Sequence, residues 1–325
     1  MMGPMGKTDR GLRIVALGGG TGLATLLRAA KRLPLASLSA IVTVTDDGGS
    51  SGRLRREHGV PPPGDVRNCL VALAEDDELL TRVFDHRFPG VGETGGHSLG
   101  NLLMTALHQI TGDFPSAVRL AGEVLRIRGS VLPATGADVH LLAEGRDGSR
   151  LVGESAISLG GPPRRLKLSP PAPPALPEAV AALGGADLVV LGPGSLYTSI
   201  LPNLLVPGIA AAVAASPARR VYVANLVTQP GETDGYPLAR HLAELAAYAP
   251  AVGIDAVLVN EAPLPEATAA AYRATGAEPV VAPAEWDGPG ELIARRLLRV
   301  TADGTVRHAP GALAAALAEL LQPSR

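Results

Sequence analysis

The chain has 325 residues, with 29 lysines and arginines against 31 aspartates and glutamates, so its formal net charge is −2. Hydrophobic residues make up 46% of it, which suffices for a sizeable core and excludes a disordered chain. The near-neutral balance argues against a general DNA- or RNA-coating protein, and the single cysteine, Cys69, excludes an internal disulfide framework and a cysteine-based zinc cluster.

No stretch of the sequence is long enough to predict a membrane span. The most apolar run, 204–215, has twelve residues and contains Pro207 and Gly208, whereas a span needs about 20 consecutive apolar residues. The residues before the first predicted strand lack the hydrophobic core of a signal peptide. We therefore expect a cytoplasmic protein with no membrane span and no nucleic-acid partner.

The chain opens with the pattern of a nucleotide-binding α/β unit. Residues 13–17 form an apolar run that predicts a buried strand, three glycines follow, and 21–33 have helical periodicity. A second buried strand is predicted over 39–47, and the glycine- and serine-rich segment 48–65 is expected to be a flexible polar loop. Helical periodicity then covers 66–88, 97–110 and 114–127.

A β-rich stretch is predicted next, beginning at 129–135. Alternating residues on either side of Arg146, Asp147 and Gly148 predict a hairpin. The proline-rich segment 161–180 has the composition of an interdomain linker. We interpret it as an extended crossover, because a helix start and another buried strand follow it at once.

The second half alternates strands and helices. This alternation predicts an α/β fold with a mostly parallel, doubly wound sheet. We expect a flexible N-terminus over 1–12 and one α/β domain over 13–325, with a helical and β insertion at about 65–175. The predicted strands are 186–195, 219–227, 255–260 and 279–283, the helices are 238–248, 265–275 and 310–321, and a small hairpin covers 297–309.

Two glycine-rich loops follow apolar strands. Gly18 to Gly22 (GGGTG) lies between a strand and a helix, where glycine lets the backbone approach a ligand and the helix N-terminus favours an anion. The loop has neither the P-loop spacing nor a lysine, which disfavours a P-loop ATPase. Gly192 to Ser195 (GPGS) repeats this arrangement after a second buried strand. The pair predicts a phosphate-binding crevice, with tight strand–helix turns as the alternative.

Carboxylates close the second predicted strand. Asp46 and Asp47 stand where an α/β enzyme holds a metal–phosphate complex or a ribose, although adjacent strand residues point to opposite faces. Mg²⁺ typically takes one or two carboxylates plus ligand phosphates. A turn-forming pair before two glycines is the alternative. We expect Asp65 to cap the next helix.

Two further polar clusters are candidates for the ligand site. Before an apolar helix, His97, Ser98 and Asn101 can present one face to a ligand, because Ser98 and Asn101 are three residues apart. The segment 224–236, which follows the apolar VYV run of the next strand and contains Asn225 and Thr228, is too polar for a plain return loop. A capping histidine and a solvated loop are the alternatives. The histidines have no zinc-ligand spacing.

These motifs, in this order, resemble the YvcK-like gluconeogenesis factors. The strings that carry the resemblance are GGGTGL, VTVTDDGGSSGRLR, PPPGDVRNCL, GHSLGNLL, GSVLPAT, ADLVVLGPGSLYTSILPNLLVPGI and ANLVTQPGET. The wider superfamily includes the 2-phospho-L-lactate transferases. The resemblance covers about residues 13–320 and implies a Rossmann-like α/β fold with helical and small β insertions. It also implies binding of UDP-N-acetylglucosamine, with effects on gluconeogenic growth, cell-wall precursor flow and cell shape.

The resemblance also implies a set of ligand-binding residues. Tyr272 would pack against a base or sugar, with helix packing as the alternative, and Arg307 would pair with phosphate, since arginine makes bidentate phosphate contacts. In the transferase branch Asp46 and Asp47 would bind Mg²⁺. The expected nucleotide-site residues are Gly19, Gly20, Thr21, Gly22, Asp46, Asn101, Gly194, Ser195, Asn225, Thr228, Tyr272 and Arg307.

Two functions from different classes follow. The first is a regulatory protein that binds the nucleotide sugar and signals to protein partners, without an established catalytic activity and with no certain cofactor. The second is a Mg²⁺-dependent transferase of the 2-phospho-L-lactate transferase type, acting by positioning and electrostatics. A dinucleotide oxidoreductase is disfavoured, because the third glycine of its fingerprint is missing. We expect a homo-oligomer, most simply a dimer.

Overall fold

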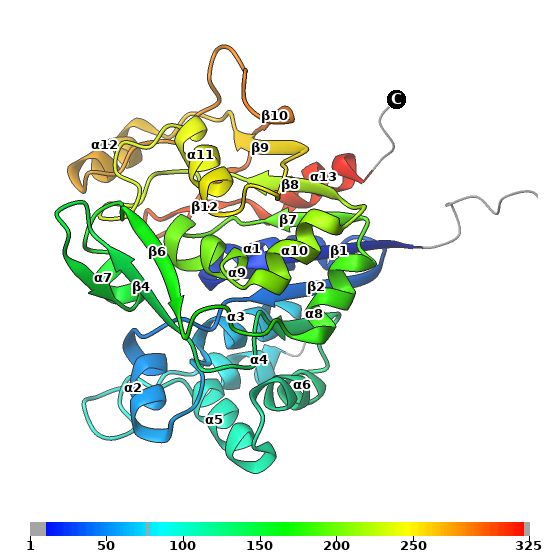
Figure 1. The fold of residues 1–325 in the computed structure, drawn as a ribbon, viewed down its shortest axis with the longest axis vertical. Helices are drawn as coiled ribbons and strands as arrows, with labels where there is room; N and C mark the ends of the chain where they lie inside the picture. The colour runs from blue at the N-terminus through cyan, green and yellow to red at the C-terminus, as the bar shows by residue number, and fades with distance from the viewer. Residues whose placement is uncertain (1–10, 76–77, 322–325) are drawn as a thin grey trace, which may run out of the picture.

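The computed structural model describes residues 11–75 and 78–321. At its centre lies a seven-stranded parallel sheet with the order β10-β9-β8-β7-β1-β2-β3 and helices on both faces (Figure 1). The order reverses at β1, because β2 and β3 are added on one side and β7 to β10 on the other. The prediction of a parallel, doubly wound α/β sheet is confirmed. The strands are β1 (Leu12–Gly18), β2 (Leu35–Val42), β3 (Ser130–Pro133), β7 (Leu188–Leu191), β8 (Arg219–Val223), β9 (Ala256–Asn260) and β10 (Glu291–Arg295).

An apolar core covers each face of this sheet. Alternate residues of β1 belong to different cores: Ile14 packs on one face and Val15 on the other. Both faces are buried, so the central strands are continuously apolar. The first face packs against α1 (Gly20–Ala30), α3 (Gly64–Leu73), α6 (Phe114–Val124) and α13 (Pro310–Leu320), and the second against α8 (Pro177–Gly184), the π-helix Leu196–Ile200, α9 (Leu201–Leu204), α10 (Pro207–Ala215) and α11 (Leu238–Tyr248).

A small antiparallel sheet is attached beside the main one. It has the order β5-β4-β6, and its hairpin turn lies at Gly145 to Ser149, as predicted. The predicted C-terminal hairpin is also present, as β11 (Leu298–Val300) paired with β12 (Val306–His308). Figure 1 shows the small sheet next to α2. The remaining elements are β4 (His140–Glu144), β5 (Arg150–Val152), β6 (Arg165–Ser169), α2 (Gly49–His58), α4 (Glu78–Asp85), α5 (Leu99–Thr111), α7 (Glu154–Ile157) and α12 (Glu266–Ala274).

The segment 48–65 differs from its prediction. Instead of a flexible polar loop it contains helix α2, which is followed by the capping residue Gly59 in the left-handed conformation, with a φ of +64°. Its polar residues are buried by tertiary hydrogen bonds rather than by an apolar stripe: Ser51 Oγ accepts from the N–H of Gly64 at 3.1 Å. Hydrophobic periodicity could not reveal such a helix, because its mean composition is polar.

Other expected elements also differ from the structure. No strand forms at 279–283, where Pro279 makes only an isolated bridge, and the edge of the sheet is formed instead by β10. β2 stops at Val42, before the carboxylates. The helical stretch 66–88 is divided between α3 and α4. Of the predicted flexible N-terminus, residues 1–10 lie outside the described part of the chain, while β1 already begins at Leu12.

Within residues 11–75 and 78–321, no single helix is long and apolar enough to cross a membrane. The segments Leu196–Leu204 and Pro207–Ala215 reach that length and composition only as a pair, which is bent by 77°.

Candidate functional site

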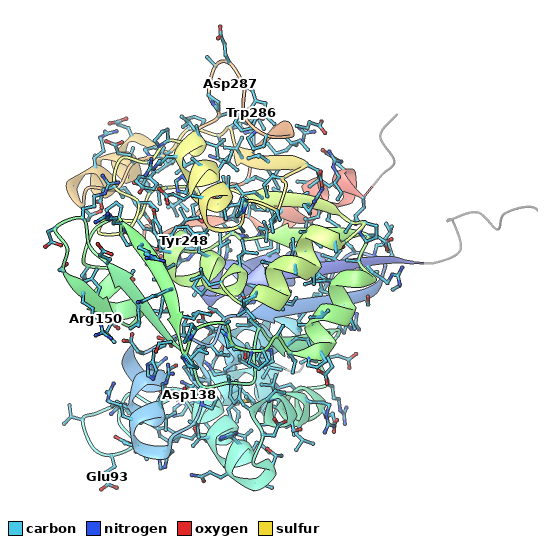
Figure 2. All side chains as sticks on the ribbon, in the orientation of Figure 1. Glu93, Asp138, Arg150, Tyr248, Trp286 and Asp287 are labelled. Carbon is cyan, nitrogen blue, oxygen red and sulfur yellow. The ribbon has the colours of Figure 1, made fainter. Side chains whose placement is uncertain are left out.

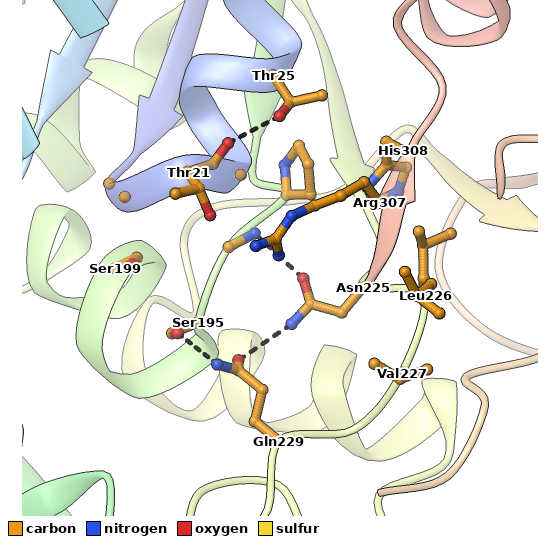
Figure 3. A pocket seen from close by; sticks show the side chains of 16 residues that line it. Thr21, Thr25, Ser195, Ser199, Asn225, Leu226, Val227, Gln229, Arg307 and His308 are labelled. Atoms are coloured by element: carbon orange, nitrogen blue, oxygen red, sulfur yellow. Dashed lines mark hydrogen bonds between the residues drawn. The ribbon is translucent and has the colours of Figure 1, made fainter. Parts of the chain in front are cut away.

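The two glycine-rich loops meet where the strand order reverses. β1 ends at Gly18, and its neighbour β7 ends at Leu191. In doubly wound sheets, ligands bind outside the carboxyl ends of the strands at such a switch point. A cavity of about 290 Å³ opens here (Figure 3). It is lined by Gly19, Gly20, Thr21, Gly22, Thr25, Pro193, Gly194, Ser195, Ser199, Asn225, Leu226, Val227, Gln229, Val306, Arg307 and His308.

The first loop brings backbone rather than side chains to the cavity. Helix α1 begins at Gly20, whose φ of +61° favours glycine. A Cβ atom on Gly22 would lie 2.3 Å from the carbonyl oxygen of Pro193, so only glycine allows the two loops this close approach. The first turn of α1 presents N–H groups and the positive end of the helix dipole, which together favour an anion.

The loop after β8 orders the second glycine loop. Asn225 Oδ1 accepts from the Gly194 N–H at 3.1 Å, and Asn225 Nδ2 donates to Gln229 Oε1 at 3.4 Å. Gln229 Nε2 then donates to Ser195 Oγ at 2.7 Å (Figure 3). This chain of side-chain hydrogen bonds fixes the position of the Ser195 hydroxyl at the cavity wall.

A buried carboxylate supports the same loop from behind. Glu232 is 1% exposed, and its Oε1 accepts from the N–H groups of Tyr197 at 2.7 Å and Thr198 at 3.2 Å. These donors favour the charged form, but burial outweighs them and raises the pKa of Glu232 to about 7. The carboxyl therefore gains its proton near neutral pH.

This raised pKa predicts a pH-dependent stability. Between the usual pKa of a glutamate and about 7, the folded protein keeps a proton that the unfolded chain has released, so its unfolding free energy falls as the pH rises. Glu232→Gln removes this dependence. From pH 5 to pH 8, we expect urea denaturation to show the unfolding free energy of the variant rising by about 2–3 kcal/mol relative to the wild type.

The control for this measurement is Glu285→Gln, at an exposed site. We expect it to track the wild type at every pH. Parallel pH curves for wild type and Glu232→Gln would show that the Glu232 carboxyl does not titrate differently in the folded and unfolded chains.

Asn203 ties the two glycine loops together from beneath. Its side chain is fully buried, and its Nδ2 donates to the carbonyl oxygens of Gly18 at 3.0 Å and Ser199 at 2.7 Å. One amide therefore connects the end of β1 to the helical segment that follows the second loop. Asn203 lies within one of the strings that carry the family resemblance, but it was not expected in the site because the residues around it are mostly apolar.

The C-terminal hairpin contributes a cation. Arg307 on β12 is exposed and lines the cavity, and its side chain makes no hydrogen bond or ion pair within the described ranges of the chain. Its neighbour His308 is 7% exposed, and burial lowers its pKa to about 4, so the imidazole is neutral at pH 7. The free charge on the cavity wall is therefore that of Arg307.

A group of carboxylates lies beside the glycine loop. Asp65, expected to be a cap, is half-buried and lies against this loop: a Cβ on Gly19 would lie 2.5 Å from Asp65 Oδ2, and the Gly20 N–H donates to its carboxylate. Burial and the neighbouring charge of Asp46 raise the pKa of Asp65 to about 7. Pro63, not Asp65, holds the N-cap position of α3.

The two expected metal ligands take different partners. Asp46 Oδ1 accepts from the Gly48 N–H at 2.9 Å, whereas Asp47 Oδ1 accepts from the N–H and the hydroxyl of Ser155, both at 2.9 Å. Among residues 11–75 and 78–321, no three His, Cys, Asp or Glu side chains are grouped so that they could hold a metal ion. The two carboxyl groups are therefore held by different backbone segments.

The structure gathers most of the expected nucleotide-site residues and leaves four outside the cavity lining. Asn101 is buried and donates from Nδ2 to Ser50 Oγ at 3.0 Å, and the Thr228 hydroxyl accepts from the Glu278 N–H at 2.9 Å. Tyr272 accepts from the Val306 N–H at 2.9 Å through its hydroxyl, and Asp46 lies by Gly48. The expected residues that do line the cavity are Gly19, Gly20, Thr21, Gly22, Gly194, Ser195, Asn225 and Arg307.

Comparison with known proteins identifies relatives along almost the whole chain. The family model described as 2-phospho-L-lactate transferase CofD matches residues 14–294. The gluconeogenesis factor of Bacillus subtilis is 45% identical over 95% of this chain and 98% of its own length, and that of Halalkalibacterium halodurans is 49% identical over 82% and 83%. A crystal structure of a UPF0052 family member from Bacillus halodurans superposes with a TM-score of 0.89 at 42% identity, covering 95% of this chain and 99% of that one. The chain therefore belongs to the CofD-like family, and its relatives there are gluconeogenesis factors.

Proposed function

We propose that this protein binds UDP-N-acetylglucosamine in the switch-point cavity and acts in the cytoplasm as a regulator. Its occupancy would report cell-wall precursor supply and influence gluconeogenic growth and cell shape. The observation that carries the proposal is the lining of the cavity: two glycine loops and one unpaired cation, Arg307, at the position where doubly wound sheets bind nucleotides.

Each part of the lining suits one part of a nucleotide sugar. The first turn of α1 and Gly194 offer close backbone contact to the diphosphate, and the Arg307 guanidinium offers it a bidentate cation. Asn225 and Gln229 hold the backbone of Gly194 and the hydroxyl of Ser195 in position for that contact. Tyr272 acts indirectly in this proposal, because its hydroxyl holds the backbone of Val306 next to Arg307.

The lining favours binding over turnover. Its side chains are hydroxyls, amides, apolar groups, one arginine and one buried histidine, and it includes no carboxylate. No Asp or Glu side chain therefore lines the cavity to act as a general base, whereas several hydrogen-bond donors do line it.

The experiment that tests the proposal is calorimetric titration with UDP-N-acetylglucosamine, beside UDP-glucose, GDP and NAD, with and without Mg²⁺. We expect micromolar binding that is selective for the N-acetyl sugar. Arg307→Ala should weaken it by about 10- to 100-fold, because the diphosphate loses a charge-assisted pair of hydrogen bonds.

Arg299→Ala is the matched control, since Arg299 lies directly opposite Arg307 in the β11–β12 pair and is absent from the cavity lining. We expect it to bind like the wild type. Equal losses in both variants would show that the charge of the hairpin, rather than contact by Arg307, supports binding.

A transferase is the second candidate. It is favoured by the family model, whose name is that of a 2-phospho-L-lactate transferase, and by the half-buried carboxylates Asp46 and Asp65 beside the glycine loop. Tight, Mg²⁺-dependent binding of GDP in the same titrations, without a response to the UDP sugar, would support this candidate and exclude the first.

A further inference from the structure

The outer face of the small sheet carries an ordered set of side chains. The β-strand register sets Leu142 of β4 between Val152 of β5 and Lys167 of β6. The next row along the same face sets Glu144 between Arg150 and Arg165. Side chains two residues apart on a strand share a face, so the two rows form one continuous surface.

This surface has an excess of positive charge. Arg150, Arg165 and Lys167 are all exposed, and none of them makes an ion pair within the part of the chain that the structure describes. The one carboxylate between them, Glu144, is already bound to Arg164 at 3.0 Å. In a chain whose net charge is −2, this concentration of unpaired cations is local.

The cations surround a hollow with an apolar strip beside it. The hollow has a volume of about 280 Å³, and its lining includes Leu142, Glu144, Arg150, Arg165 and Lys167. We call it the basic hollow. Val152 next to it is 51% exposed, which leaves an apolar contact available at its rim. Figure 2 shows Arg150 on the side of the small sheet that faces away from the main sheet.

We propose that the basic hollow binds an acidic, extended segment of a partner protein. Carboxylates fit the planar guanidinium groups of Arg150 and Arg165 in bidentate geometry, and an apolar side chain of the segment covers Val152. Complementary charge of this kind selects partners and speeds their association. The proposal does not depend on which nucleotide occupies the switch-point cavity.

The composition of the surface favours a protein segment over nucleic acid. The outward residues of the three strands, His140, Leu142, Glu144, Arg150, Val152, Arg165, Lys167 and Ser169, include no Phe, Tyr or Trp on which bases could stack. Strands of three to five residues also provide too short a track for the backbone of a polynucleotide.

Fluorescence anisotropy with labelled decapeptides tests the proposal. The acidic peptide alternates glutamate and serine around one central leucine, and its matched peptide carries glutamine in place of every glutamate. We expect saturable binding of the acidic peptide alone, weakened by salt. The double variant Arg165→Glu, Lys167→Glu should raise its Kd by about tenfold or more, since two attractions become repulsions.

The double variant Arg296→Glu, Arg299→Glu is the matched control, because it makes the same change in net charge at exposed positions outside the small sheet. We expect it to keep wild-type binding. Arg150→Glu, on another strand, provides a second test should the first variant unfold. Equal weakening by the control, or unchanged peptide binding in the Arg165 and Lys167 variant, would overturn the proposal. So would a titration in which a labelled single-stranded oligonucleotide binds in place of the acidic peptide and the Arg165 and Lys167 variant loses that binding.

Discussion

Gly22→Ala is expected to abolish nucleotide binding and to lower the free energy of unfolding by about 1–3 kcal/mol. The new methyl carbon would lie 2.3 Å from the carbonyl oxygen of Pro193 and 2.8 Å from its carbonyl carbon. Both atoms are backbone, so no side chain can rotate away. The two glycine loops must separate, and the cavity between them changes shape. Calorimetric titration and thermal unfolding of the variant measure the two effects.

Gly184→Ala is the matched control for this substitution. Gly184 also lies in a helix, but nothing lies within 4 Å of a Cβ atom placed there. Alanine should therefore stabilise the protein by up to about 1 kcal/mol through its helix propensity and leave binding unchanged. Wild-type affinity in Gly22→Ala would mean that the contact between the loops is not needed to shape the nucleotide site.

The framework of the fold could be predicted because parallel strands have a strong sequence signal. β1, β7 and β9 are buried on both faces, so each appears as an apolar run bounded by glycine or polar residues. The glycines after β1 and β7 then marked the ends of two neighbouring strands. The position of each glycine loop at a strand end therefore followed from local sequence, whereas their meeting at the switch point depends on the strand order, which did not.

What could not be predicted depends on contacts between distant segments. Helix α2 is polar, and its first turn is buried because Ser50 bonds to His97, 47 residues away, and Ser51 bonds to Gly64, 13 residues away. β10 alternates only weakly and forms an edge by pairing with β9. Neither arrangement leaves a periodic pattern that a single sequence reveals.

The site was predicted unevenly for the same reason. Motif residues on the two glycine loops line the cavity, but Asp65 lies beneath the first loop, although capping was its expected role. Tyr272 is directed to the backbone of β12 by a hydrogen bond that connects it to a residue 34 positions away. Short motifs indicate which backbone is close to a ligand, whereas the supporting polar groups are set by tertiary packing.

Asn203→Asp is expected to destabilise the protein most strongly at high pH. The amide donates to two carbonyl oxygens, of Gly18 and Ser199, whereas a carboxylate can only accept. An ionised carboxyl at this fully buried position would face both carbonyls without a donor, so the folded protein should retain its proton. We expect a loss of about 3 kcal/mol or more at pH 8, and a smaller loss at pH 5.

Asn203→Ala separates the missing donors from the added charge. It also deprives the two carbonyl oxygens of their shared donor and leaves a small cavity, so it should cost about 2–3 kcal/mol. It introduces no titrating group, so that cost should be the same at pH 5 and pH 8. Denaturant unfolding of both variants at the two pH values makes the comparison. A pH-independent loss in Asn203→Asp would show that the end of β1 and the segment after β7 can separate enough to hydrate the carboxylate, and that Asn203 does not hold the two loops together.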